Sequence, residues 1–211
     1  MRIRNFSGSK ELLEQSNVVV KNPEDNKGKW RDIFNNDNPI HMEIGMGKGN
    51  FLLGMAQKYS DINFIGVEQY DTIVARAVKK IEETELENIK IVKIDAIELG
   101  NVFDHEIDLI YLTFSDPWPK ARHEKRRLTS HKFLNVYDGL FKNDMTIVQK
   151  TDNFDLYSYS IESLENYGYK IIQASVDLAN SDIPNIKTEY EEKFMNLGVK
   201  INYLKAVKNK V

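Results

Sequence analysis

The chain has 211 residues, of which 29 are lysine or arginine and 32 are aspartate or glutamate, and its formal net charge of −3 excludes a protein coated uniformly in positive charge. It contains no cysteine, which excludes disulfides, thiolate nucleophiles and thiolate-bound metals, and its four histidines show no spacing typical of a metal site. No stretch has the apolar length of a signal sequence or a membrane span, so we expect a cytoplasmic protein with no membrane partner and no metal.

Residues 1–38 carry scattered basic side chains without clean periodicity, and we expect an N-terminal extension ahead of one domain at 39–211. From residue 40 onward, short β-rich apolar runs alternate with segments of helical periodicity. This alternation is typical of an α/β fold in which helices cover both faces of a parallel sheet. Strands are expected near 40–44, 62–68, 89–94, 107–114 and 144–149, and helices near 49–59, 71–86, 130–140 and 154–167.

The alternation breaks near the end of the chain. Residues 169–178 and 199–207 are predicted to be two further strands, and the segment between them includes one short helical stretch at 189–198. Such a pair suggests antiparallel pairing at one edge of the sheet.

A glycine-rich turn follows the first predicted strand, which ends at Glu43 and Ile44. Gly45, Gly47 and Gly49 let the backbone take positive φ and approach a ligand closely at the mouth of the sheet. The dinucleotide fingerprint would need glycine at Asn50, and a P-loop would need serine or threonine directly after its lysine, so both phosphate-binding interpretations weaken.

Glu43 favours a cationic ligand over a pyrophosphate, because a carboxylate repels phosphate and attracts positive charge. S-adenosylmethionine is such a ligand, since it carries a sulfonium and an ammonium and no phosphate. Glu68 and Asp95 end the next two strands, where they could accept hydrogen bonds from ribose hydroxyls and from an adenine amino group. The alternatives are a glycine turn that only joins strand to helix, and acids that only cap helices or turns.

The fourth strand runs into FSDPWPK at 114–120, beside the densest basic run of the chain. Two prolines stiffen the loop around Asp116 and Trp118. Aspartate can accept from the N–H groups of guanine, tryptophan can stack on a base, and the neighbouring cations can hold phosphates. The alternative is a rigid turn followed by a solvated charge run.

Taken together, EIGMGKGNF, Glu68, Asp95, FSDPWPKARHEKRRL, QKTDN and TEYEEKF resemble the bacterial tRNA (guanine-N7-)-methyltransferases, in order from about residue 40 onward. The resemblance implies a Rossmann-like, seven-stranded sheet, mostly parallel with an antiparallel edge strand and helices on both faces. It implies methyl transfer from S-adenosylmethionine to N7 of a guanine in the variable loop of tRNA. The sequence does not distinguish a monomer from a homodimer.

By position, the resemblance implies that the methyl donor contacts Glu43, Glu68, Asp95 and Asp116 beside the three turn glycines, and that Asp116 is also the catalytic residue. One departure is Thr113, where we expect asparagine; it leaves Asp116 intact and bears on the hydrogen bonds behind it. The residues implied to contact tRNA are Lys120, Arg122, His123, Glu124, Lys125, Arg126, Arg127, Asp152, Thr188, Glu189, Tyr190 and Glu191.

Two of these positions also have local explanations. Asp152 could cap the helix expected at Phe154, and Thr188 with Glu191 three residues later fits a capping box. Three rival functions stay open on the residues alone: an amino-group methyltransferase, a nicotinamide-dependent oxidoreductase and a non-catalytic RNA-binding module. The order Asp-Pro-Trp-Pro counts against the first, and Asn50 and Glu43 count against the second.

Overall fold

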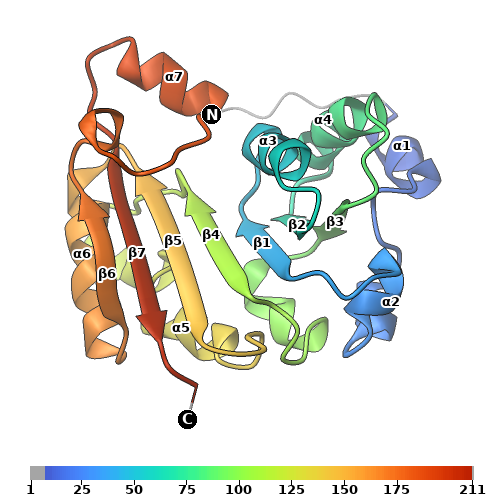
Figure 1. Cartoon of the computed structure of the whole chain (residues 1–211), viewed down its shortest axis with the longest axis horizontal. Helices are drawn as coiled ribbons and strands as arrows, with labels where there is room; N and C mark the ends of the chain where they lie inside the picture. The colour runs from blue at the N-terminus through green and yellow to red at the C-terminus, as the bar shows by residue number, and fades with distance from the viewer. Residues whose placement is uncertain (1–7, 211) are drawn as a thin grey trace.

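The computed structural model describes residues 8–210 of the chain. Seven strands form one sheet in the order β3-β2-β1-β4-β5-β7-β6 (Figure 1). Strands β1 to β5 pair in parallel, whereas β7 pairs antiparallel with both β5 and β6. The strands are β1 (Ile40–Ile44), β2 (Asn63–Glu68), β3 (Ile89–Lys93), β4 (Leu109–Thr113), β5 (Met145–Thr151), β6 (Lys170–Ser175) and β7 (Asn202–Lys208).

Helices lie on both faces of the sheet. The helices α1 (Ser9–Gln15), α3 (Asn50–Lys58) and α4 (Asp71–Glu82) lie on one side, beside β1, β2 and β3, whereas α5 (His131–Tyr137) and α6 (Phe154–Asn166) lie behind the other strands (Figure 1). The shorter elements are α2 (Trp30–Phe34), α7 (Glu189–Met195) and the 3-10 helices η1 (Pro23–Asn26), η2 (Ala96–Asn101), η3 (Ala121–Arg126) and η4 (Leu178–Asn180).

The apolar pattern of each strand supplies a core on each face. In β4, Ile110 and Leu112 join one buried cluster and Tyr111 joins the other, as the twofold alternation of a strand requires. In α4, the buried residues Val74, Ala77, Val78 and Ile81 recur at helical spacing. The α/β fold predicted from these periodicities is confirmed. The ends of the elements differ from the predicted ones by a few residues.

The sheet order places the candidate site. Strand order reverses at β1, which lies between β2 and β4, and such a point leaves a crevice at the carboxyl ends of the strands. The antiparallel pair that the sequence predicts at one edge is β6 and β7, with β7 inserted between β5 and β6.

The described part of the N-terminal residues packs against the sheet. Val19 forms an isolated parallel bridge with Ile91 on the outer edge of β3, which shields that edge. Trp30 is fully buried, stacks on Phe103 with ring centroids 4.6 Å apart, and donates from Nε1 to the carbonyl of Val102 at 2.9 Å. The boundary at residue 38 stays a prediction.

In the stretch from residue 8 to residue 210, no helix combines the length and the apolar character needed to cross a membrane.

Candidate active site

The glycine turn after β1 borders open space. Gly45, Gly47 and Gly49 have φ values of 77°, 55° and 73°. A Cβ atom added at Gly45 or Gly47 would meet nothing within 4 Å, whereas one added at Gly49 would lie 3.1 Å from the Cβ of Ala77. Gly45 and Gly47 therefore suit close approach by a ligand, and Gly49 lets the start of α3 pack against α4.

Glu43 is a buried carboxylate directly behind this turn, with only 1% of its surface exposed. The hydroxyl of Thr113 donates a hydrogen bond to its Oε1, and its Oε2 has no hydrogen-bond partner in the described part of the chain. Burial raises the pKa of Glu43 to about 8, against the opposing effects of the Thr113 hydrogen bond and the Lys150 charge. An orphaned buried oxygen of this kind is stabilised by a cation brought to the turn.

Glu68 lies at the end of β2, beside the same turn. Its Oε1 accepts hydrogen bonds from the backbone N–H groups of Gln69 at 2.8 Å and Tyr70 at 3.2 Å. Burial raises the pKa of Glu68, the N–H of Gly47 is one of the groups that lower it, and the charge of Asp116 raises it further. Glu68 thus lies within electrostatic reach of both the glycine turn and the loop that follows β4.

Asp95 lies two residues beyond β3, whose last residue, Lys93, is in register with Glu68. It is exposed, and its Oδ1 accepts from the N–H of Ile97 at 3.1 Å. The capping alternative is therefore confirmed for Asp95, which caps η2 through one of its carboxylate oxygens.

The loop after β4 is held in an unusual conformation. Phe114 and Trp118 have positive φ values of 51° and 43°, which bulky side chains rarely adopt. Arg127 donates from Nε to the carbonyl of Pro117 at 3.1 Å and from Nη2 to that of Trp118 at 3.2 Å. The guanidinium therefore braces the loop, in which Asp116 is exposed.

The basic run divides into bracing and surface side chains. The guanidinium of Arg127 lies 4.2 Å from the ring centroid of Tyr159 on α6, and the hydroxyl of Tyr159 donates to Glu124 at 2.9 Å. Arg127 and Glu124 thus fasten η3 to α6.

Arg126 and His123 instead surround Trp118. The guanidinium of Arg126 lies 4.8 Å from the Trp118 ring centroid, and the His123 ring meets the same ring edge-on at 5.7 Å. Aromatic rings are the side chains on which nucleic-acid bases stack, and arginine adds cation–π contributions at such sites. The exposed cations of the run are Lys120, Arg122, Lys125 and Arg126.

The predicted substrate residues of KTDN and TEYE meet beside the loop. The hydroxyl of Tyr190 donates to Asp152 at 3.4 Å, and its ring centroid lies 4.9 Å from that of Phe114. The capping alternative for Asp152 is wrong, because the side chain of Asn153 caps α6 by accepting from the N–H of Leu156 at 2.7 Å.

Thr188 and Glu191 behave differently from each other. Thr188 caps α7, as the capping-box alternative predicts, by accepting from the N–H of Glu191 at 2.8 Å. The carboxylate of Glu191 does not reach back, since it is fully buried in an ion pair with Lys150 at 3.2 Å. Glu189 begins α7, and its side chain lies outside the described part of the chain.

These carboxylates form a connected electrostatic neighbourhood. The charge of Glu68 acts on Glu43, and the charge of Asp116 acts on Glu68. Burial raises the pKa of Tyr190, and the charges of Asp152 and Asp116 raise it further. Residues from β1, β2, the loop after β4 and the start of α7 are thus brought to one edge of the sheet.

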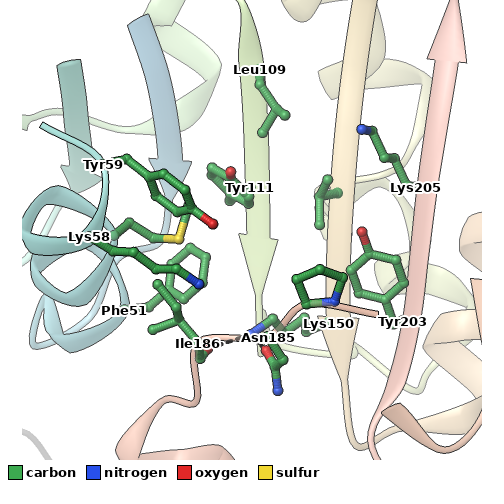
Figure 2. A pocket seen from close by; sticks show the side chains of 13 residues that line it. Phe51, Lys58, Tyr59, Leu109, Tyr111, Lys150, Asn185, Ile186, Tyr203 and Lys205 are labelled. Carbon is green, nitrogen blue, oxygen red and sulfur yellow. Dashed lines mark hydrogen bonds between the residues drawn. The ribbon is translucent and has the colours of Figure 1, made fainter. Parts of the chain in front are cut away.

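Sequence reasoning missed Lys150, the first residue of KTDN, which is 4% exposed. The signal that could have found it is a lysine in the strand MTIVQKT, in which every other residue except Thr146 is buried. Lys150 also lines a pocket of about 150 Å³ between α3, β4, β5 and β7 (Figure 2), and none of the predicted ligand-binding residues lines it. In residues 8–210, no group of three histidine, aspartate or glutamate side chains is arranged to hold a metal ion.

Comparison with known proteins shows which family the chain resembles. A family model described as "Putative methyltransferase" matches residues 37–204. The tRNA (guanine-N(7)-)-methyltransferase of Lachnoclostridium phytofermentans is 46% identical over 213 residues and 100% of both chains, and that of Bacillus subtilis is 47% identical over 201 residues and 94% of both chains.

A similar fold occurs in the 16S rRNA (adenine(1408)-N(1))-methyltransferase of Catenulisporales acidiphilia, solved with the cosubstrate SAM. The two structures superpose with a TM-score of 0.62 at 12% identity, over 90% of this chain and 92% of that chain. At this identity the likeness establishes the fold alone.

Proposed function

Since the chain belongs to the family of tRNA (guanine-N(7)-)-methyltransferases, we propose that it transfers a methyl group from S-adenosylmethionine to N7 of a guanine in the variable loop of tRNA. The observation that carries the proposal is the buried Glu43, with one oxygen unpartnered in the described structure, behind an open glycine turn. The proposed partner is tRNA, and the proposed location is the cytoplasm. That the protein is a monomer or a homodimer stays a prediction.

The residues present fit the methyl donor. Glu43 would face its positive charge, Glu68 would accept from the ribose hydroxyls, and Asp95 would accept from the adenine amino group. Gly45 and Gly47 leave room for the ligand to approach the backbone. When bound, S-adenosylmethionine supplies a methyl carbon on a sulfonium, whose sulfur leaves as a neutral thioether.

The reaction requires no strong general base. N7 of guanine carries no proton at neutral pH, so its lone pair can form the new N–CH₃ bond as the S–CH₃ bond breaks. The positive charge moves from sulfur to the purine, and no proton is transferred. The chain therefore contributes alignment of the two reactants and a negative charge near the purine.

Asp116 is the residue proposed for both tasks. It is exposed at the site, in a loop braced by Arg127, and its charge reaches Glu68 on the donor side and Tyr190 on the other. From there its carboxylate can accept from the Watson-Crick N–H groups of guanine and stabilise the charge that develops on the ring. The exposed cations around Trp118 would hold the flanking phosphates.

The test is direct. The protein is incubated with isotopically labelled methyl donor and unmodified tRNA, the tRNA is digested to nucleosides, and the product is identified by mass spectrometry. N7-methylguanosine is expected, and it should disappear when the variable-loop guanine is replaced by adenine. A labelled nucleoside of another kind, or label elsewhere in the tRNA, would overturn the assignment.

A further inference from the structure

Lys150 occupies a position that the proposed chemistry does not explain. It lies on β5, in register with Thr113 of β4 on one side and Tyr203 of β7 on the other. Its side chain is 5% exposed, although a lysine is rarely buried unless it is paired. Its Nζ points toward the segment that leads into α7, as Figure 2 shows for Asn185 and Ile186.

All three N–H groups of the Lys150 ammonium are used on one short segment. They donate to Oδ1 of Asn185 at 2.5 Å, to the carbonyl of Ile186 at 2.8 Å and to Oε2 of Glu191 at 3.2 Å. The other carboxylate oxygen of Glu191 accepts from the amide of Asn185, which closes a ring of contacts. An ammonium has three donors, so this single segment satisfies it completely.

The same segment also packs tightly against α3. A Cβ atom at Gly54 would lie 3.1 Å from the side chain of Ile186, so the absence of a side chain there permits the contact. The Lys150 ammonium itself lies 4.7 Å from the centroid of the Phe51 ring on α3. The segment is thus fastened between α3 and the end of β5.

The fastened segment carries Tyr190. This tyrosine precedes Glu191 directly, and it contacts Phe114 of the loop that carries Asp116. The helix α7 projects beyond the ends of β5 and β7 (Figure 1), so its placement depends on how residues 185–191 are attached.

We propose that Lys150 is a positioning residue: it ties residues 185–191 to the end of β5 and so sets where Tyr190 stands relative to Phe114 and Asp116. The inference rests on the proposed function, because Tyr190 matters for turnover only if guanine is bound there. The tie itself is independent of any substrate.

The main experiment compares Lys150→Met with Lys205→Met. Lys205 lies on β7, opposite Val148, and lines the same pocket. Within residues 8–210, its ammonium does not make the hydrogen bonds to residues 185–191 that the Lys150 ammonium makes. Amide hydrogen exchange is expected to accelerate over 185–197 in Lys150→Met and to stay unchanged over β4 and in Lys205→Met. Unchanged exchange over 185–197 in Lys150→Met would overturn the tie.

Turnover gives the second readout, measured at saturating methyl donor. Lys150→Met is expected to lower kcat on tRNA by about 30-fold with a much smaller change in KM, since misplaced groups cost alignment. In a Tyr190→Ala background the same substitution should change kcat by less than about threefold, because coupled residues are not additive. Full additivity of the two substitutions would refute the route through Tyr190.

A double variant guards against simple misfolding. Lys150→Met with Glu191→Met removes both buried charges, which is tolerated better than removing one. It should fold, retain fast exchange over 185–197 and keep the low kcat; recovery of wild-type kcat would sink the proposal. If the wild-type protein does not methylate tRNA, the proposed function fails, whereas the exchange result still decides the tie.

Discussion

The hydroxyl of Thr113 donates a hydrogen bond to the carboxylate of Glu43, which joins the ends of β4 and β1 where the strand order reverses. Thr113 is the position at which the chain departs from the asparagine expected from the resemblance. Its hydroxyl shows what a donor at this position does, because it lowers the pKa of a carboxyl group that burial would otherwise raise further.

Replacing Thr113 with valine should therefore weaken binding of the methyl donor. The substitution keeps the shape of the side chain and removes the donor, so the ionised form of Glu43 loses a hydrogen bond of about 1.5–3 kcal/mol, or roughly tenfold or more in affinity. Calorimetric titration with S-adenosylmethionine measures the change. Thr113→Ser retains the hydroxyl and should bind as the wild type does; equal weakening in both variants would contradict this role.

The raised pKa of Glu43 predicts how stability depends on pH without ligand. Its pKa of about 8 in the folded protein lies above its ordinary value of 4.5, so between these pH values the folded state holds a proton that the unfolded state has released. The protonated side chain of Glu43 therefore contributes its full stabilisation of the folded state below pH 4.5, and this stabilisation is lost as pH rises toward 8.

Glu43→Gln removes this titration. As pH rises from 5 to 8, the free energy of unfolding of the variant should increase relative to that of the wild type, by about 4 kcal/mol at most. Thermal denaturation of both proteins across that pH range measures the difference. A constant difference in Tm at every pH would mean that Glu43 titrates normally.

The strands, and the acids at their carboxyl ends, could be predicted because their signals are local. Apolar runs define β1 to β5. Acids at or just after the carboxyl ends of these parallel strands lie at the same end of the sheet, whatever the rest of the topology. Trp30 illustrates the opposite case: it belongs to a segment without periodicity, yet it is a fully buried core residue whose partners lie some seventy positions away, near Val102.

The roles of charged residues were harder to predict because their partners are also distant in the sequence. Within the basic run, Arg127 and Glu124 are fastened to Tyr159, which is 35 residues from Glu124, and nothing local distinguishes them from Lys125 or Arg126. Lys150 and Glu191 are 41 residues apart, and only the folded chain brings them together. Pairing over such separations is decided by topology rather than by pattern.

Asp116 should be needed for chemistry and not for folding. Because it is exposed, Asp116→Asn should leave Tm and the affinity for the tRNA nearly unchanged, while kcat falls by about 100-fold or more through loss of the charge near the purine. Steady-state kinetics with unmodified tRNA measures this. Asp155→Asn, at an exposed aspartate in the first turn of α6, is the matched control and should behave as wild type; near-normal turnover by Asp116→Asn would remove Asp116 from the mechanism.

The two kinds of cation in the basic run should separate in a salt series. Lys125 and Arg126 are exposed, so replacing both with alanine should weaken tRNA binding. The dependence of log Kd on log salt should flatten by about 0.7–0.9 for each phosphate that the variant no longer neutralises. Filter binding at several salt concentrations measures the slope.

Arg127→Ala provides the contrast. Its guanidinium is committed to the carbonyls of Pro117 and Trp118 and to the face of Tyr159, so its removal should loosen the loop around Asp116 and lower kcat. The salt slope should stay at its wild-type value, because the interactions with phosphate are all retained. A slope reduced as much as in the Lys125 and Arg126 variant, with kcat preserved, would place Arg127 among the RNA-binding residues instead.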